Sequence, residues 1–409
     1  MCKMDIGTLC LLGLMFLCIS SCNDERDPAS ACAPVTNTNA PGISWMKHFN
    51  GSQLESHGHF LHACTDGGFI QLGETGTPPM AKMFVVKIDD QGALLWKTEL
   101  GNLGIQMANS LIETTNSYVI IGQIDGNSCI VQLDRSSGQT MASNTFELGG
   151  QDAFEHAIPY GTGYLAVGYH HAADGLNTFF AEGTGLISLL DAQFNLIESR
   201  SIGMYMAHAY RVNRSNDGIY ISGLNEDAQD YSLLKLNDSL EVQWHQTYGG
   251  PADDHNFGMD IDLQGNIFLT GHSRSSRANW DTYTMKIDPN GLKLWEVWAG
   301  NPRGFDPEYI HDEAWDIKCT TDGGCLVVAG TGDEYSNYSA YCATGQWRSD
   351  QWAAYLIKID SVGQIEWQTV FQEASGVDWA GEAVLLTADG GALLAIDNGA
   401  FGFLKTDPF

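Results

Sequence analysis

Short runs of alternating apolar and polar residues recur along the chain, and most runs are bounded by a turn that contains glycine. A glycine turn at residues 65–68 leads into an alternating strand at 69–72, a further strand at 84–88, an Asp90-Gln91-Gly92 turn and a strand with Trp96. A period of two predicts half-buried β-strands, and Asp-Gly or Asn-Gly pairs supply the positive φ of tight hairpins. The pattern therefore predicts a chain of short antiparallel strands.

This order of turns and strands repeats with a period of about fifty residues, which is the length of a propeller blade. The seven inner turns, six of which contain glycine, lie at residues 65–68, 115–117, 160–163, 216–218, 263–265, 321–324 and 388–391; we call them the glycine turns. Many third strands end in Lys-Ile-Asp or a close variant, and several fourth strands carry a tryptophan: Trp96, Trp244, Trp295 and Trp367. Four short strands per repeat predict seven blades.

The two ends of the repeat region predict how the ring closes. The seventh unit has a third strand near residues 401–405 but no tryptophan strand, whereas residues 43–51, with Trp45, match a tryptophan strand and precede the first turn. This strand is expected to complete the last blade and remove the open sheet edges. The predicted fold is an all-β, seven-bladed β-propeller with four-stranded antiparallel blades, spanning residues 43–409.

The N-terminus has the order of a lipoprotein signal. Lys3 precedes an apolar run at residues 9–18, too short to span a bilayer, and Ile19-Ser20-Ser21-Cys22 resembles a bacterial lipobox. The resemblance implies a signal peptide at 1–21 and a lipid on Cys22; an ordinary signal peptide is the alternative. Residues 22–42 read as a flexible tether. The acidic stretch at 23–27 resembles the surface-export signal of Bacteroidetes lipoproteins, so an outer-membrane lipoprotein on the periplasmic face or the cell surface is expected, with membrane contact through the lipid alone.

The repeated Thr-Asp-Gly-Gly, Lys-Ile-Asp and tryptophan elements are similar to the tandem propeller repeats of secreted and lipid-anchored Bacteroidetes proteins. The tryptophan positions are also similar to those of quinoprotein-type propellers. Two units depart from the pattern, because Thr140-Met141 and Asn195-Leu196-Ile197 stand where a tryptophan is expected. That departure weakens the case for a quinone enzyme, and no cofactor is predicted.

Charge and cysteine content narrow the classes of ligand. The formal net charge of −30 argues against nucleic acid and against anionic headgroups, since both require a cationic surface. Cations and neutral ligands remain, and simple solubility is the alternative reason for the acidity. The chain has no CxxC motif, and its cysteine spacings suit neither zinc nor haem, so no metal site is predicted. One disulfide among Cys319, Cys325 and Cys342 is a hypothesis, with buried free thiols as the alternative.

Polar residues recur just before the glycine turns, where the start of each innermost strand is expected to border the central channel. The candidate ligand-binding residues there are His57, His59, Asn109, His156, His208, His255, Asn256, His311, Glu313 and Glu382, with Glu155, Asp312 and Asp378 beside them. Imidazoles, carboxylates and amides can hold a glycan by hydrogen bonds. A solvated channel mouth without a ligand is the alternative. An insertion at residues 333–352 adds Tyr338, Tyr341 and Trp347, which suit a sugar face or a protein partner.

The leading functional prediction is a non-catalytic binding module for a glycan or a protein partner, with no catalytic residue. The first alternative is a glycan hydrolase or lyase that takes its acid and base from His156, His208, His311, Glu313 and Glu382. The second alternative is a structural component of an envelope complex, which a large apolar patch on the blade exteriors would indicate.

Overall fold

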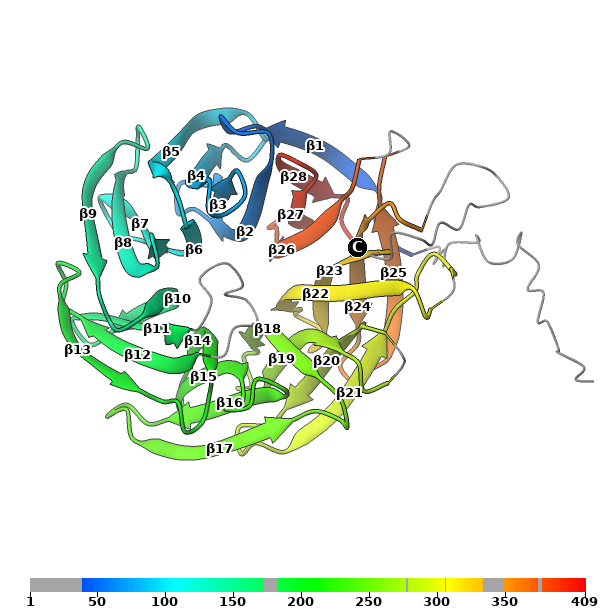
Figure 1. Cartoon of the computed structure of the whole chain (residues 1–409). Helices are drawn as coiled ribbons and strands as arrows, with labels where there is room; N and C mark the ends of the chain where they lie inside the picture. Colours follow the sequence, from blue (N-terminus) through cyan, green and yellow to red (C-terminus); the bar gives the residue numbers. More distant parts are fainter. Residues whose placement is uncertain (1–38, 173–182, 277–278, 306, 334–348, 374–376) are drawn as a thin grey trace, which may run out of the picture.

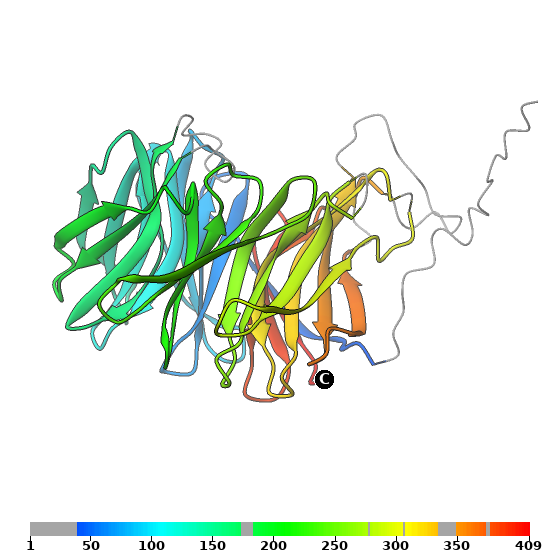
Figure 2. The same cartoon turned by 90° about the horizontal axis from the view of Figure 1, so that it is seen from below.

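The computed structural model describes residues 39–172, 183–276, 279–305, 307–333, 349–373 and 377–409. These residues form seven four-stranded antiparallel sheets, arranged as blades around a central axis (Figure 1), and they include no helix. Figure 2 shows the ring from the side, with the C-terminus at its lower edge in that view. The predicted seven-bladed β-propeller is confirmed.

Six of the sheets run in sequence order from the axis to the perimeter, and in the seventh the N-terminal strand is outermost, so that equivalent strands form four concentric rings. The innermost strands are β2 (Ser56–Ala63), β6 (Gln106–Glu113), β10 (Gln151–Tyr160), β14 (His208–Ser215), β18 (Asp254–Ile261), β22 (Ile310–Cys319) and β26 (Ala380–Leu386). The second strands are β3 (Phe69–Thr75), β7 (Ser117–Ile124), β11 (Gly163–Ala172), β15 (Gly218–Leu224), β19 (Ile267–Ser273), β23 (Cys325–Asp333) and β27 (Ala392–Asp397). The third strands are β4 (Ala81–Ile88), β8 (Asn127–Asp134), β12 (Thr184–Leu190), β16 (Tyr231–Leu236), β20 (Asp281–Ile287), β24 (Ala353–Ile359) and β28 (Phe401–Thr406). The outermost strands are β5 (Leu94–Gly104), β9 (Thr140–Phe146), β13 (Leu196–Ser201), β17 (Val242–Tyr248), β21 (Lys293–Ala299), β25 (Ile365–Phe371) and β1 (Ile43–Phe49).

We number the blades from the one that begins with β2, so blade 7 contains β26, β27, β28 and β1. The strand β1 pairs antiparallel with β28, with Trp45 opposite Lys405 and Phe49 opposite Phe401. The expected closure by the N-terminal strand is therefore confirmed. We call the face where the innermost strands begin the mouth face, and the opposite face, which carries the glycine turns, the turn face.

The hydrophobic core lies between neighbouring blades. Phe84 and Val86 of blade 1 pack against Phe401 and Phe403 of blade 7, and the Phe84 and Phe401 rings lie 4.6 Å apart. Comparable clusters join each of the six remaining pairs of adjacent blades. Second and third strands are covered on both faces, which explains why runs such as β4 are apolar almost throughout.

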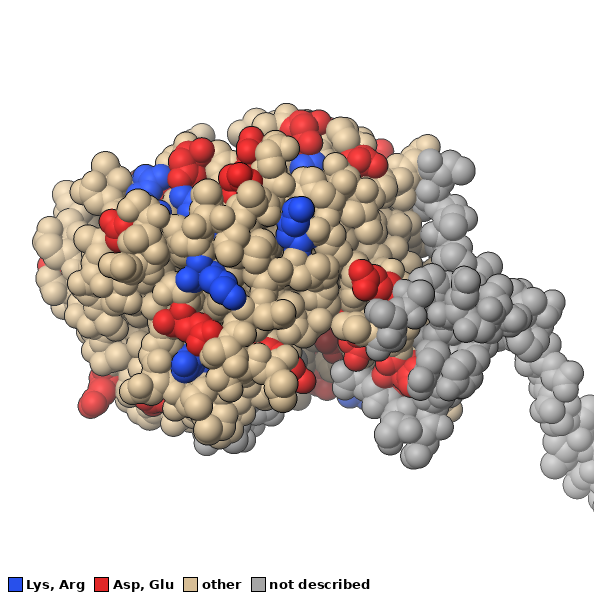
Figure 3. All heavy atoms as spheres, turned by 90° about the horizontal axis from the view of Figure 1, so that it is seen from above, with Lys and Arg blue, Asp and Glu red and all other residues tan. Residues whose placement is uncertain are grey.

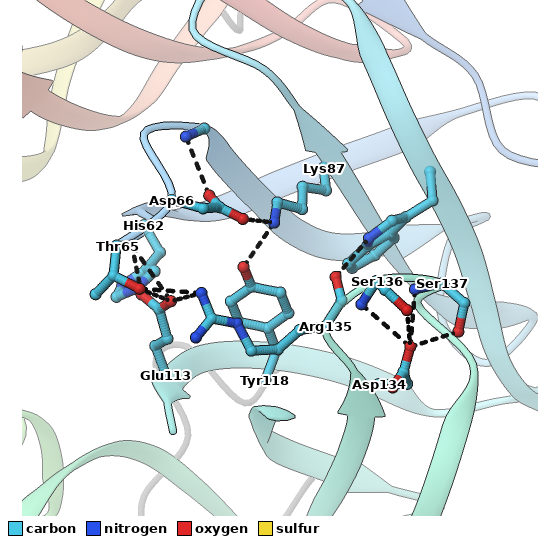
Figure 4. Close-up of polar contacts among 12 residues, drawn as sticks. His62, Thr65, Asp66, Lys87, Glu113, Tyr118, Asp134, Arg135, Ser136 and Ser137 are labelled. Atoms are coloured by element: carbon cyan, nitrogen blue, oxygen red, sulfur yellow. Dashed lines mark hydrogen bonds and ion pairs between the residues drawn. The ribbon is translucent and has the colours of Figure 1, made fainter. Parts of the chain in front are cut away.

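The lysine of the Lys-Ile-Asp motif forms an ion pair with the aspartate of the glycine turn in its own blade. Lys87 contacts Asp66 and donates a hydrogen bond of 2.7 Å to the Tyr118 hydroxyl of blade 2 (Figure 4). Equivalent pairs join Lys235 to Asp217 at 2.6 Å, Lys286 to Asp262 at 3.3 Å, Lys358 to Asp322 at 2.7 Å and Lys405 to Asp389 at 2.9 Å. Beside the first pair, Glu113 accepts hydrogen bonds from the Thr65 amide and hydroxyl and pairs with Arg135. The most repetitive part of the sequence thus forms a set of ion pairs that stabilise the turn face.

The tryptophans join each blade to the next one. A Cβ at Gly138, in the outer hairpin of blade 2, would lie 2.5 Å from the Trp96 ring of blade 1, and the Trp96 indole donates a hydrogen bond of 3.1 Å to the Arg135 carbonyl. Trp45, Trp244 and Trp295 contact Gly92, Gly291 and Gly363 of the following blades in the same way. A Cβ would lie 3.0 Å or less from the indole at Gly92, Gly138 and Gly363, and all four glycines have a positive φ that favours glycine.

The two blades without this tryptophan carry a compensating change in the next blade. Strand register places Ala142 and Glu198 at the tryptophan position, rather than Thr140-Met141 and residues 195–197 as expected from the sequence. The hairpins of blades 3 and 4 that face them carry Phe194 and Leu240 where the others have glycine. Both side chains are buried, so an apolar group from the following blade fills space that an indole occupies elsewhere.

Cys64, Cys129, Cys319 and Cys325 are free thiols. Cys319 and Cys325 lie opposite each other in β22 and β23 without a bond, and Cys342 lies outside the described residues. Burial raises the pKa of the Cys64 thiol to about 11, so this thiol stays protonated and unreactive at neutral pH.

Candidate functional site

One β-bulge recurs at the same place in every blade. The pairing of the innermost and second strands slips by one residue, and the residue left unpaired lies seven positions before a turn residue. The seven unpaired residues are His59, Asn109, Glu155, Tyr210, Phe257, Trp315 and Glu382. A bulge re-aims the side chain that it carries. We call these seven residues the bulge ring.

The bulge ring encloses a small cavity. Together with Arg211 its members line a cavity of about 40 Å³. That volume holds a few water molecules but no sugar ring or peptide side chain. Just beyond it, Phe60 of blade 1 and His156 of blade 3 approach each other across the axis, with ring centroids 6.0 Å apart. Within the bulge ring itself there is thus no room for a ligand of that size.

The bulge ring is polar on blades 7, 1, 2 and 3. His59 Nε2 lies 2.9 Å from both carboxylate oxygens of Glu74, and Glu155 lies 3.0 Å from His208 Nε2. Asn109 donates a hydrogen bond of 3.0 Å to the Phe154 carbonyl of the next blade. Although burial disfavours its charge, the Glu74 carboxylate raises the pKa of His59. Three of the four polar members are thus held by a second residue.

The bulge ring is aromatic on blades 4, 5 and 6. The ring centroids of Tyr210 and Phe257 lie 4.9 Å apart, and those of Phe257 and Trp315 lie 4.5 Å apart. His208 stacks on Tyr210 at 3.9 Å, and His272 packs against Phe257 at 5.2 Å. These contacts form a continuous aromatic wall along half of the channel.

A larger hollow opens on the mouth face between blades 6, 7 and 1. Its volume is about 430 Å³, which is within the range of ligand pockets. The lining residues are Glu55, His57, Glu313, Trp315, Trp352, Val377, Asp378, Ala380, Glu382, Asp397, Asn398 and Gly399. Trp315 and Glu382 line both this hollow and the cavity inside the bulge ring. We call the larger space the mouth hollow.

Carboxylates in the mouth hollow occupy unlike environments. Burial raises the pKa of Glu382 to about 7, and the neighbouring Asp397 charge acts in the same direction. Burial acts against ionisation of Glu313 as well, but His311, whose Nδ1 lies 3.7 Å away, and the nearby His272 lower the pKa of that carboxyl. His57 Nδ1 donates a hydrogen bond of 2.5 Å to Asp397; despite burial, this partner raises the pKa of His57 to about 9.

The candidate residues predicted from the sequence lie on the innermost strands and fall into several levels of the channel. His59, Asn109, Glu155 and Glu382 belong to the bulge ring, and His57, Glu313, Asp378 and Glu382 line the mouth hollow. His208 and His255 stand two positions before the bulge, whereas Asn256 uses its amide to hold the Gly258 and Thr270 carbonyls at 3.2 and 2.9 Å. The sequence predicted that these polar groups form one ring at a single depth of the channel, whereas the structure places them at several depths.

The remaining predicted histidines are poorly suited to proton transfer at the channel. Burial and the Arg211 guanidinium lower the pKa of His156 to about 3, and its Nδ1 lies 3.0 Å from the Val212 carbonyl. Burial and His272 lower the pKa of His255 to about 3. His208 is 1% exposed. Asp312 is also buried and lines neither space, and burial raises its pKa to about 7.

Tyr210, Phe257 and Trp315 were missed from the sequence because only polar residues were sought there. A constant offset identifies them, since each bulge-ring residue lies seven positions before Asp66, Asn116, Thr162, Asp217, Gln264, Asp322 or Asp389. Tyr338, Tyr341 and Trp347 lie outside the described residues, whereas Trp352 of the same insertion lines the mouth hollow. Among the described residues, no group of three or more His, Cys, Asp or Glu is placed to hold a metal ion.

Basic residues do not form a track on the side of the ring drawn in Figure 3. There, Lys and Arg side chains are scattered among Asp and Glu rather than joined in one patch. The described part of the chain includes no helix long and apolar enough to cross a membrane. Exposed apolar side chains recur near the starts of the outermost strands, among them Leu95, Met141, Ile197 and Leu294. They belong to different blades and are therefore spread around the perimeter.

Comparison with solved structures agrees with the propeller fold. The chain is similar to the Pan2 WD40 domain of Neurospora crassa, with 10% identity and a TM-score of 0.55 over 86% of this chain and 89% of that one. It is also similar to YCF48 bound to D1 peptide, with 11% identity, a TM-score of 0.52 and coverage of 93% and 99%. Sqt1 of Chaetomium thermophilum, bound to the N-terminus of the ribosomal protein L10, has 8% identity, a TM-score of 0.51 and coverage of 88% and 98%. No protein-family model matches the sequence, and no curated protein matches it significantly.

Proposed function

We propose that this chain is a lipid-anchored, non-catalytic binding module that holds a protein partner on its mouth face. The observation that carries the proposal is the mouth hollow of about 430 Å³, which combines indole rings with carboxylates above a closed channel. Tryptophan surrounded by polar groups is typical of the anchoring pockets of protein interfaces. A protein side chain can enter such a hollow without passing through the ring.

Two of the similar propellers support a protein partner. The two structures are of YCF48 bound to D1 peptide and of Sqt1 bound to the N-terminus of the ribosomal protein L10. At 11% and 8% identity these likenesses concern the fold, and folds host many functions. The support they give is that a propeller of this shape can present a peptide-binding face.

Site-specific photocrosslinking tests the partner. A benzophenone amino acid in place of Val377, which lines the mouth hollow, is expected to yield a discrete protein adduct in the native envelope. The same group in place of Leu292, exposed in an outer hairpin on the turn face, serves as the control. Equal labelling at both positions, or none at Val377, would contradict a partner at the mouth face.

The lipid anchor rests on the lipobox-like sequence that ends at Cys22, which lies outside the described residues. Acylated Cys22 would tether the propeller to the outer membrane through residues 22–42. The expected result is that radiolabelled palmitate enters the wild-type chain and not Cys22→Ala, and that the variant moves to the soluble fraction. Labelling of Cys22→Ala would contradict the proposal.

A glycan is the other ligand class for the same hollow, because indoles stack on sugar rings and carboxylates accept sugar hydroxyls. A glycan array probed with the full chain distinguishes the two. A sugar hit that is lost in both Trp352→Ala and Glu313→Ala would replace the protein partner with a glycan.

A glycan hydrolase or lyase is the second candidate function, favoured by one observation. Glu382 and Glu313 line the same hollow while the pKa of the first is raised and that of the second is lowered. Two carboxyl groups whose pKa values differ in this way can act as the acid and the base of a reaction. Release of nitrophenol from a panel of aryl glycosides, abolished by both Glu382→Gln and Glu313→Gln, would establish this activity.

A further inference from the structure

The mouth hollow is strongly acidic. Its lining includes the carboxylates of Glu55, Glu313, Asp378, Glu382 and Asp397, and His57 is the single basic side chain among its lining residues. His57 is committed to Asp397 at 2.5 Å and lies 3.7 Å from Glu55. The histidine therefore offsets part of the negative charge and leaves an excess of carboxylates facing the cavity.

Among the described residues, one carboxylate of this hollow accepts no hydrogen bond and forms no ion pair. Asp397 is paired with His57, Glu313 lies beside His311, and Asp378 accepts a hydrogen bond of 2.9 Å from the Trp352 amide. Glu382 stands at the junction of the hollow and the bulge ring, and no hydrogen bond or ion pair to it is found among the described residues. A deeply placed carboxylate without a partner is costly unless a ligand supplies the missing donor.

The hollow also offers the faces of aromatic rings. The Trp352 indole packs on β23, where a Cβ at Gly332 would lie 2.4 Å from the ring and one at Gly330 would lie 3.1 Å from it, and Trp352 also lines the hollow. Trp315 lines the hollow beside Glu382. An indole face attracts a cation within about 6 Å of its centroid, and tryptophan is the best such partner.

We propose that the mouth hollow is a receptor for a basic side chain, lysine or arginine, presented by the protein partner. The cationic head lies against Glu382 and Glu313, and its aliphatic stem packs along Trp352 and Trp315. The volume of about 430 Å³ accommodates a basic side chain together with part of its backbone. This inference rests on the proposed function, because it names the group by which the partner is held.

Other ligand chemistries fit the hollow less well. Carboxylates repel phosphate, sulfate and other anions. A neutral sugar would leave the Glu382 charge uncompensated at neutral pH and above. A basic side chain supplies charge and donors to the carboxylates and an apolar stem to the indoles at the same time.

Fluorescence anisotropy with a defined probe tests the proposal. The probe is a fluorescein-labelled peptide of alternating glycine and lysine, and its fully lysine-acetylated counterpart has the same length without the charge. Because the whole chain is acidic, binding is compared between two variants that remove one charge each: Glu382→Gln in the hollow and Glu226→Gln, an exposed residue in the loop after β15 on the mouth face outside the hollow. A single cooperative melting transition in each variant would show that both are folded.

The full chain is expected to bind the lysine peptide and not the acetylated one. Glu382→Gln is expected to weaken binding about tenfold, as loss of one charge-assisted contact does. Trp352→Leu is expected to weaken it several-fold, and Glu226→Gln is expected to leave it unchanged. Equal affinities for Glu382→Gln and Glu226→Gln would overturn the proposal by showing diffuse attraction to an acidic surface.

The outcomes separate this inference from the proposed function. If the lysine peptide fails to bind while Val377 crosslinks a protein, the partner stands and the basic side chain is wrong. If neither experiment gives a signal, both are wrong.

Discussion

Seven side chains stand at one backbone position, yet the bulge ring has two unlike halves. Blades 7, 1, 2 and 3 contribute Glu382, His59, Asn109 and Glu155, and blades 4, 5 and 6 contribute Tyr210, Phe257 and Trp315. The same bulge directs each of them toward the axis. The polar half is held mostly by hydrogen bonds to second residues, whereas the aromatic half is held by contact among its own members. The repeated backbone therefore determines where these side chains point, and the residue type at each position determines the chemistry of that part of the channel.

The largest effect is expected from the centre of the aromatic half. Phe257 is 4% exposed and touches both Tyr210 and Trp315. Phe257→Ala should lower the free energy of unfolding by about 3–5 kcal/mol, because it removes a buried ring and leaves a cavity. Denaturant unfolding measures the loss, with Phe257→Leu as the milder control. A change below about 1 kcal/mol would show that the aromatic wall is not part of the core.

In the polar half, the charge pair between His59 and Glu74 should be worth less than the aromatic centre. His59→Leu leaves Glu74, which is 5% exposed, without its partner and should cost about 3 kcal/mol at pH 6. Adding Glu74→Gln should recover part of that loss, because the second change removes the unpaired buried charge. A double-mutant cycle gives the coupling free energy, and additive losses would mean that the two groups do not interact.

Glu382 should make the polar half sensitive to pH. Burial raises its pKa in the folded protein from the ordinary 4.5 to about 7. The resulting contribution to stability is fully present below pH 4.5 and is lost as the pH rises through 7, a fall on the order of 2–3 kcal/mol. His57 and His59 on β2, Asp397 on β27 and Glu313 on β22 act on this carboxyl. Unfolding curves between pH 4 and 8 should show the fall in wild type and Glu226→Gln, and a smaller fall in Glu382→Gln. Identical curves for all three would contradict the raised pKa.

The fold was predictable because its signals are local and repeated. Glycine turns, alternating strands and the orphan strand around Trp45 each require only neighbouring residues to be recognised, and seven copies reinforce one another. The role of the repeated lysine was not predictable in the same way, since the pairing of Lys87 with Asp66 depends on which strands are adjacent. The replacement of the tryptophan–glycine contact was not predictable either, because it involves two blades: one blade lacks the tryptophan, and the next carries Phe194 or Leu240 in place of the glycine.

The site was predictable only in part. His59, Asn109, Glu155 and Glu382 were found because polar residues near a channel stand out, and Tyr210, Phe257 and Trp315 were missed because aromatic residues resemble core. The mouth hollow was beyond prediction from sequence, since it brings together Glu55 with Asp397, from the two ends of the propeller region. The level of a side chain in the channel depends on the bulge, and the residue types at the bulge do not reveal it; only the constant distance to the turn does, once the structure has located one bulge.

The smallest effect on stability is expected at Trp315, the one aromatic member of the bulge ring that also lines the mouth hollow. Trp315→Phe keeps an aromatic contact with Phe257 and should change the free energy of unfolding by only about 1 kcal/mol. The same change reduces the indole face offered to a cation, so the lysine peptide should bind about threefold more weakly, because phenylalanine is the poorer partner. Tyr210→Phe, which lies outside the hollow, is the matched control and should not alter peptide binding. If Trp315→Phe and Tyr210→Phe bind the peptide equally, the aromatic half serves stability alone and the division between the halves is structural rather than functional.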